Sequence, residues 1–135
     1  MSENISKQIR SEVTKEGKLL IYIESTEIPE PKEDEVLIKI EASPIIPSDL
    51  GLLIGPADVS SMSVSGEGEA AVVTMDIPEG LLRMLETRLD QSLPVGNEGG
   101  GVVVNAGSSE LEDLVGKTVG AVSYTHLTLP TNREV

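Results

Sequence analysis

The stretch Leu93–Gly107, which reads LPVGNEGGGVVVNAG, most constrains how this chain can fold. Glycines are concentrated in its first half, at 96 and 99–101, and three consecutive valines, Val102–Val104, follow directly. Glycine permits positive φ angles and the close approach of another backbone or of a ligand. A short β-branched run bounded by glycine is typical of a buried strand. The stretch therefore predicts either a bulged, glycine-rich start of a strand, or a turn that presents the polar pair Asn97 and Glu98.

The composition excludes several classes of protein. The 135 residues, a length that suits one domain, include two aromatic side chains, both tyrosine, so the core must consist of Val, Ile, Leu and Met. A formal net charge of −13 disfavours nucleic acid and anionic membrane surfaces as partners. The absence of cysteine excludes disulfides, thiolate metal ligands and a cysteine nucleophile. The N-terminus is polar and no apolar run reaches about 18 residues, which predicts a cytoplasmic protein without a signal peptide or a membrane span.

The hydrophobic pattern predicts mostly β structure. Weak alternation over Lys7–Val13 and a continuous apolar run at Leu19–Ile23 indicate a hairpin. Glu35–Ala42 alternates more cleanly, and Gly116–Val122 resembles the start of another strand. Pro56–Glu69 is rich in serine and glycine and is interpreted as an exposed loop. Because the strands follow one another in hairpin order, we expect an antiparallel barrel.

Two helices are predicted, one longer and one short. The longer helix spans Asp76–Asp90, where a capping box precedes leucines that recur on one face. The short helix is expected to have Ser48 or Asp49 as its N-cap and to end at Leu53. Residues Gly66–Ala71 superficially fit a dinucleotide-binding fingerprint. We reject that interpretation because a serine-rich loop precedes them and an extended run, not a helix, follows.

The last residues of the chain differ from the rest. The segment Val122–Thr131, VSYTHLTLPT, contains the single histidine, His126, and one of the two tyrosines. It resembles the in-frame translation of a transposon-end sequencing adapter. We therefore expect residues 122–135 to be an adapter-derived tail, of which residues 123–135 make few contacts, and residues 1–121 to be a natural domain whose continuation is missing. On this interpretation His126 is neither a metal ligand nor a base; the alternative is a genuine C-terminal strand.

Several motifs occur in the order seen in a known family. They are IPEPKEDEVLIKIEASPIIPSDLGLLIG from Ile28, LPVGNEGGGVVVNAGSS from Leu93 and LVGKTVGAV from Leu114. In this order they resemble the N-terminal, GroES-like catalytic domain of medium-chain dehydrogenases/reductases, in the zinc-free, quinone-oxidoreductase-like branch. The resemblance implies a mainly β fold, a partly open antiparallel β-barrel that is incomplete at its C-terminus here. It also implies a Rossmann cofactor domain that would follow in the parent protein.

The resemblance also predicts that no metal is bound. In zinc-dependent members, a Cys two residues before a Ser/Thr-Asp pair supplies one ligand, and a Gly-His-Glu turn supplies a second. This chain aligns residues 46–49, IPSD, and residues 96–98, GNE, with those two motifs. A catalytic zinc site needs about three protein ligands with N, O or S donors. Ile46 has no donor atom and Asn97 replaces the histidine, so both ligand positions are altered.

The remaining polar positions receive roles from the same resemblance. Ser48 would join a proton relay and Asp49 would help to hold the active-site cleft, so both are the candidate catalytic residues, with helix capping as the alternative. Asn97 would donate to a carbonyl oxygen or to the cofactor, whereas Glu98 would either transfer a proton or only hydrogen-bond the glycine turn. The positions expected to face the cofactor are Ile46, Pro47, Asn97 and Glu98.

These assignments predict a parent protein that is an NAD(P)H-dependent, zinc-independent oxidoreductase. Its substrate would be a quinone, an enone or a related carbonyl compound, and its assembly a homodimer. The cofactor supplies the hydride, while the protein orients and polarises the acceptor. The present chain has no strand–GxGxxG–helix unit and is expected to be inactive and cofactor-free on its own. The alternative is a non-enzymatic GroES-like co-chaperonin or protein-binding β-barrel module.

Overall fold

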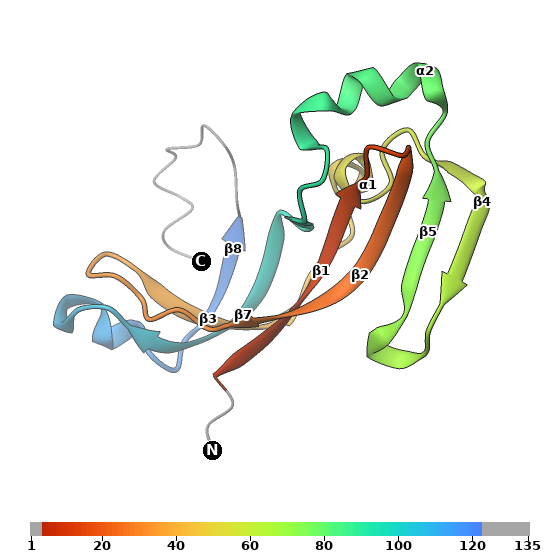
Figure 1. Cartoon of the computed structure of the whole chain (residues 1–135). Helices are drawn as coiled ribbons and strands as arrows, with labels where there is room; N and C mark the ends of the chain where they lie inside the picture. The colour runs from red at the N-terminus through yellow and green to blue at the C-terminus, as the bar shows by residue number, and fades with distance from the viewer. Residues whose placement is uncertain (1–3, 123–135) are drawn as a thin grey trace. The chain divides into compact units, whose positions relative to one another are not determined.

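A computed structural model describes residues 4–122, which are mainly β, as the hydrophobic pattern predicts (Figure 1). The strands are β1 (Ile5–Val13), β2 (Lys18–Glu27), β3 (Val36–Ala42), β4 (Asp58–Ser65), β5 (Val72–Asp76), β6 (Leu93–Pro94), β7 (Glu98–Ala106) and β8 (Thr118–Val122). The helical segments are α1 (Pro47–Leu53), α2 (Glu79–Leu82) and three 3-10 helices, η1 (Gly68–Ala70), η2 (Arg83–Arg88) and η3 (Ser109–Leu114).

The described part of the chain divides into two compact units. The first comprises residues 4–28 and 46–95, and the second comprises residues 29–45 and 96–122. The first unit contains a five-stranded sheet in the order β4-β5-β2-β1-β6, and the second a three-stranded sheet in the order β3-β7-β8. All pairings within both sheets are antiparallel, as predicted, and neither sheet closes on itself.

The predicted hairpin forms the centre of the first unit. β1 and β2 pair without interruption from Ile5 opposite Glu27 to Val13 opposite Leu19. The chain reverses at Gly17, which has a φ of 81° and donates its N–H to the carbonyl of Thr14 at 3.0 Å. A positive φ costs glycine little, so this residue suits the tight reversal.

The core of the first unit is aliphatic, as the lack of aromatic residues requires. Its buried side chains are Val13, Leu19, Met75 and Ile77, and Leu19 lies directly opposite Met75 across the β2–β5 pairing. Partly buried apolar residues pack around them, namely Ile21, Ile54, Ala57, Val73, Leu82, Leu85 and Leu89. Full burial of one such aliphatic side chain stabilises a fold by about 2 kcal/mol.

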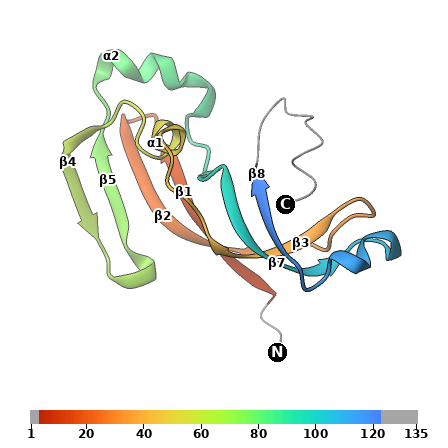
Figure 2. The same cartoon turned by 180° about the vertical axis from the view of Figure 1, so that it is seen from behind.

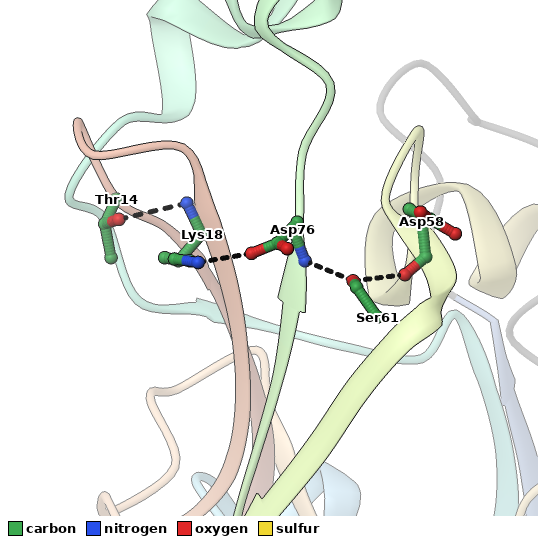
Figure 3. Close-up of polar contacts among 5 residues, drawn as sticks. All are labelled: Thr14, Lys18, Asp58, Ser61 and Asp76. Atoms are coloured by element: carbon green, nitrogen blue, oxygen red, sulfur yellow. Dashed lines mark hydrogen bonds and ion pairs between the residues drawn. The ribbon is translucent and has the colours of Figure 1, made fainter.

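The longer helix predicted at Asp76–Asp90 is observed as two consecutive helical segments over residues 79–88, and it starts later than expected. Asp76 ends β5 instead of starting a helix: its N–H donates to Ser61 Oγ at 2.7 Å and its carboxylate pairs with Lys18 (Figure 3). Only Glu79–Leu82 is α-helical, and Arg83–Arg88 continues as a 3-10 helix. In a 3-10 helix residues three apart align, so Leu82 and Leu85 still face the core together.

The serine-rich segment predicted as a loop contains a strand. β4 pairs with β5 at one edge of the five-stranded sheet, an arrangement seen from opposite sides in Figures 1 and 2. The pairing is irregular, because the register shifts between Asp58 and Ser63. Ser61 fits this irregularity: its hydroxyl donates to the carbonyl of Asp58 at 2.6 Å and accepts the N–H of Asp76 (Figure 3).

The glycine-rich stretch bends at Gly96 and then continues as a bulged strand, so the turn does not extend over the following glycines. Gly96 has a φ of 108°, and β7 then runs from Glu98 to Ala106 through all three following glycines. The register with β3 shifts twice, between Leu37 and Ile38 and between Ile40 and Ala42. A Cβ atom on Gly101 would overlap the carbonyl group of Lys39. The glycines therefore serve the close approach of two strands.

The last described strand of the second unit, β8, lies where the sequence predicted a strand at Gly116–Val122. β8 pairs with β7 from Val122 opposite Glu98 to Thr118 opposite Val102, and Val103 is buried in this unit. Val122 thus belongs to a strand. The remainder of the predicted adapter-derived tail, His126 included, lies outside the described residues.

No helix in residues 4–122 combines the length and the apolar character needed to cross a membrane.

Replacement of Gly101 by alanine should destabilise the second unit. The new methyl group would overlap the Lys39 carbonyl and push β3 away from β7, which should lower the free energy of unfolding by about 2 kcal/mol. The matched control is Gly100→Ala, whose Cβ would meet the Val119 carbonyl oxygen at 3.7 Å, an ordinary contact. Urea unfolding of the full chain measures both, and equal effects of the two substitutions would contradict the proposed role of Gly101.

Candidate functional site

The residues predicted to carry chemistry at positions 46–49 lie at the start of α1, in the first unit. Ile46 is the N-cap residue in an extended conformation, and Pro47 occupies the first helical position. Proline suits that position because its missing N–H would have no partner inside the helix. The sequence therefore folds locally so that a proline starts the helix and the Ser-Asp pair completes its first turn.

Asp49 holds this helix start from within. Its carboxylate Oδ2 accepts the N–H of Ile46 at 3.0 Å, and its own N–H donates to the Ile46 carbonyl at 2.9 Å. The side chain is only 5% exposed. A carboxylate at the third helical position that reaches back to the N-cap N–H is the acidic half of a capping box. Asp49 is thus a buried residue that orders the main chain around Ile46.

Ser48 has a different environment. It occupies the second helical position, and its side chain is exposed. The prediction that Ser48 or Asp49 is the N-cap is therefore wrong, since the N-cap is Ile46. The helix starts earlier than predicted because proline can occupy its first position. Of the two alternatives for Ser48, helix capping does not describe the structure, while a role in proton transfer stays a prediction.

Ile46 and Pro47 offer a potential ligand little besides apolar surface. The main-chain N–H and carbonyl of Ile46 are both engaged by Asp49, and its side chain has no donor or acceptor. Pro47 is exposed and has no N–H. Any contact of these two residues with a nicotinamide or a substrate ring would therefore be mainly a packing contact.

The opposite end of α1 is held by two residues that the sequence did not single out. Ser11 of β1 is fully buried, and its hydroxyl lies 3.0 Å from the Leu52 carbonyl oxygen and 3.3 Å from that of Leu53. Arg88 of η2 donates from Nη1 to the Leu52 carbonyl at 3.2 Å and from Nη2 to Ser11 Oγ at 3.0 Å. Burial lowers the pKa of the Arg88 guanidinium. The only sequence signal was a serine at an inward-facing position of β1.

A second polar group lies on the other face of the β1–β2 hairpin. The Tyr22 hydroxyl lies 2.9 Å from Glu12 Oε2 and 2.8 Å from Ser92 Oγ, and Arg10 Nε lies 2.8 Å from Glu24 Oε2. Burial, together with the hydrogen bond to Glu12 and the negative charges of Glu12 and Glu24, raises the pKa of Tyr22, although the Ser92 hydroxyl acts in the opposite direction. The phenol is therefore held neutral as a hydrogen-bond donor. This arrangement ties β1, β2 and the segment before β6 together.

The other two candidate residues belong to the second unit. Glu98 begins β7 opposite Val122 of β8 and is partly buried. Asn97 lies at the bend just before it and is also partly buried. The structure therefore groups Ile46, Pro47, Ser48 and Asp49 in one unit, and Asn97 with Glu98 in the other.

Metal-binding side chains are not clustered in the described residues. Within residues 4–122, no three His, Cys, Asp or Glu side chains lie together in a group that could hold a metal ion. No protein-family model matches this chain, and no curated protein matches it either.

Replacement of Asp49 by alanine should destabilise the first unit. Loss of the carboxylate leaves the Ile46 N–H without its acceptor and should lower the free energy of unfolding by about 1 kcal/mol. Asp49→Asn keeps an acceptor oxygen and should cost less. Ser48→Ala is the matched control, because an exposed hydroxyl next in the chain should change stability by less than about 0.5 kcal/mol. Urea unfolding measures the free energy of unfolding of each variant. A larger loss of stability for Ser48→Ala than for Asp49→Ala would contradict the capping role of Asp49.

Proposed function

We propose that this chain is the substrate-side portion of an NAD(P)H-dependent, zinc-independent oxidoreductase that reduces a quinone, an enone or a related carbonyl compound. The observation that carries the proposal is the start of α1. There the aligned Ser-Asp pair is divided between an exposed hydroxyl on Ser48 and a buried carboxylate on Asp49. The order of the motifs and the mainly β fold with antiparallel sheets also support it.

The two members of the pair have separate roles in this proposal. Ser48 would contact the substrate side, because its hydroxyl is exposed in the first turn of the helix. It would deliver a proton to the acceptor oxygen as negative charge develops there. Asp49 would act through the backbone, since its carboxylate binds the Ile46 N–H and thereby fixes the turn that presents Ser48. Asp49 is then a positioning residue.

The glycines at positions 66 and 68 do not form a cradle for the cofactor's phosphates. The glycines of Gly66–Ala71 lie in the connection between β4 and β5, where a Cβ on Gly66 would meet the Ala70 carbonyl oxygen at 2.6 Å. This is a turn between two strands, whereas a dinucleotide cradle joins a strand to a helix. NAD(P)H would supply the hydride when bound, and its phosphates would be held by the downstream domain that the proposal includes. In this proposal Asn97 would donate to a carbonyl oxygen or to the cofactor.

A protein-binding module is the second candidate, and the edge strand β4 favours it. β4 has no strand on its outer side within the described residues, and it exposes Val59, Met62 and Val64. Exposed apolar side chains on an open edge are a common basis for strand addition by a partner. The chain can be joined to the coding sequence that follows it. If that joined protein shows no NAD(P)H-dependent turnover, this second candidate is favoured.

Purified protein should contain no stoichiometric zinc. The two positions aligned with zinc ligands hold Ile46, which has no donor atom, and Asn97, an amide that binds zinc poorly. Protein incubated with zinc and then dialysed should carry far less than one metal ion per chain by elemental analysis. One tightly held zinc per chain after dialysis would contradict the zinc-independent assignment.

The activity test uses the chain joined to the coding sequence that follows it at the same genomic locus. NAD(P)H oxidation by a quinone or enone is expected for the joined protein and not for the chain alone. In the joined protein, Ser48→Ala should lower kcat about a hundredfold, because a positioned proton donor contributes at least that much. The KM for NAD(P)H should not change, and Ser48→Thr, which keeps the hydroxyl, should retain most of the activity.

Ser25→Ala is the control for this experiment. Ser25 is an exposed serine of β2, and its substitution should leave kcat unchanged. Equal kcat for Ser48→Ala and Ser25→Ala would rule out proton delivery by Ser48. If no quinone, enone or related carbonyl compound supports NAD(P)H oxidation by the joined protein, the proposed function is wrong.

A further inference from the structure

The C-terminal end of α1 has unusual hydrogen-bond partners. The carbonyl of Leu50 accepts the N–H groups of both Ile54 and Gly55, at 2.9 and 3.0 Å, and Gly55 has a φ of 55°. The carbonyls of Leu52 and Leu53 also lie in the last turn and have no partner within the helix. Other parts of the first unit supply those partners.

Ser11 is the first of these. As residue 11 of β1 it shares the inward-facing side of the strand with Val13, where it is fully buried. Its single hydroxyl hydrogen is shared between the Leu52 and Leu53 carbonyls, and its oxygen accepts from Arg88. A buried hydroxyl costs free energy unless it is hydrogen-bonded, and this one both donates and accepts.

Arg88 is the second. It is the last residue of η2, and its two terminal nitrogens bind the Leu52 carbonyl and Ser11 Oγ. These acceptors are a main-chain oxygen and a hydroxyl, not carboxylates. Desolvation of a guanidinium without a carboxylate acceptor costs free energy, which the carbonyl dipoles at a helix C-terminus offset only in part. The planar guanidinium binds two acceptors from different elements, the Leu52 carbonyl of α1 and the Ser11 hydroxyl of β1, and so fixes their relative positions.

We propose that Arg88, through Ser11 and the Leu52 carbonyl, sets the position of α1 on the first unit and so positions the exposed hydroxyl of Ser48. The helix has only seven residues, and about 6 Å of helix rise separates Ser48 from Leu52. Asp49 orders the first turn from within the helix, whereas Arg88 joins the last turn to Ser11 of β1. Because the helix is short, a displacement of its last turn would also displace Ser48. The catalytic meaning of this positioning rests on the function proposed above for Ser48.

A local anchor and a general contribution to stability predict different patterns of amide hydrogen exchange. In the full chain, Arg88→Gln should accelerate exchange of the Ile54 amide, which reports on the integrity of α1, by tenfold or more. The Ile77 amide, bonded to the Gly17 carbonyl at 2.8 Å in the buried core, should exchange at its original rate. The control is Arg83→Gln, since Arg83 is an exposed arginine of the same 3-10 helix and should change neither amide.

Ser11→Ala is the second variant, which removes the hydroxyl but keeps the backbone and nearly all of the side-chain volume. Ser11→Ala should also accelerate exchange of the Ile54 amide selectively. It therefore tests the proposal even if Arg88→Gln does not fold. Equal acceleration of the Ile54 and Ile77 amides in either variant, or no acceleration in both, would overturn the proposal of a local anchor. Arg88→Lys, which keeps the charge but cannot reach both acceptors with one planar group, should give an intermediate result.

Kinetics of the joined protein separate this inference from the proposed function. Arg88→Gln should lower kcat at least tenfold without changing the KM for NAD(P)H, and Arg88→Lys should restore part of the loss. Selective loosening of α1 with unchanged kcat would show that Arg88 anchors the helix but does not position Ser48 for the reaction, and would overturn the inference. If the joined protein has no activity, the proposed function fails, while the exchange pattern still decides whether Arg88 anchors the helix.

Discussion

The packing of Val13 and Leu19 against Met75 and Ile77 is the interaction on which the first unit depends. These residues bring together both strands of the β1–β2 hairpin, the end of β5 and the segment that leads into α2. Without Phe or Trp in the chain, each buried aliphatic residue supplies a large share of the hydrophobic stabilisation. Neighbouring apolar residues such as Ile54, Leu82 and Leu85 extend the same cluster and so hold α1, α2 and η2 against the sheet.

Polar groups at the margin of this core add directional contacts to the apolar packing. Hydrophobic burial is non-directional and would allow α1 to slide or rotate over β1. The hydrogen bonds from Ser11 and Arg88 to the last carbonyls of α1 are directional and join the end of the helix to β1 and η2. On the other face of the hairpin, Tyr22 with Glu12 and Ser92 joins the strands to the segment before β6 in the same manner. The first unit thus combines a small apolar core with directional contacts at both of its faces.

The second unit depends on a different constraint, the absence of side chains at particular glycines. Gly101 lies against the carbonyl of Lys39, and Gly107 lies against that of Lys32, so a Cβ atom at either position would overlap backbone. Side-chain burial is correspondingly modest, with Val103 the fully buried apolar residue among those described in this unit. Here the backbone contacts between β3 and β7 take the place of interdigitating side chains.

Local periodicity and composition were enough to locate several features of the fold. Alternation and apolar runs located the β1–β2 hairpin, β3 and β8, and the lack of aromatic residues required the aliphatic core that is observed. The strand at Asp58–Ser65 was not predicted, because serine has no strong strand preference and only pairing with β5 makes this segment extended. A capping-box pattern at Asp76 was likewise overridden, since the same residue pairs with β2 and binds Lys18.

The roles of the candidate residues depend on contacts that no local pattern predicts. Ser48 and Asp49 are adjacent and both suit a helix start, so the sequence alone could not tell that Asp49 turns back to Ile46 while Ser48 is exposed. Arg88 and Ser11 are separated by 77 residues, and their joint contact with α1 exists only because the core brings β1 and η2 together. Local preferences fix which elements form, whereas the hydrogen-bond partners of a buried hydroxyl or guanidinium are fixed by chain segments that are distant in sequence.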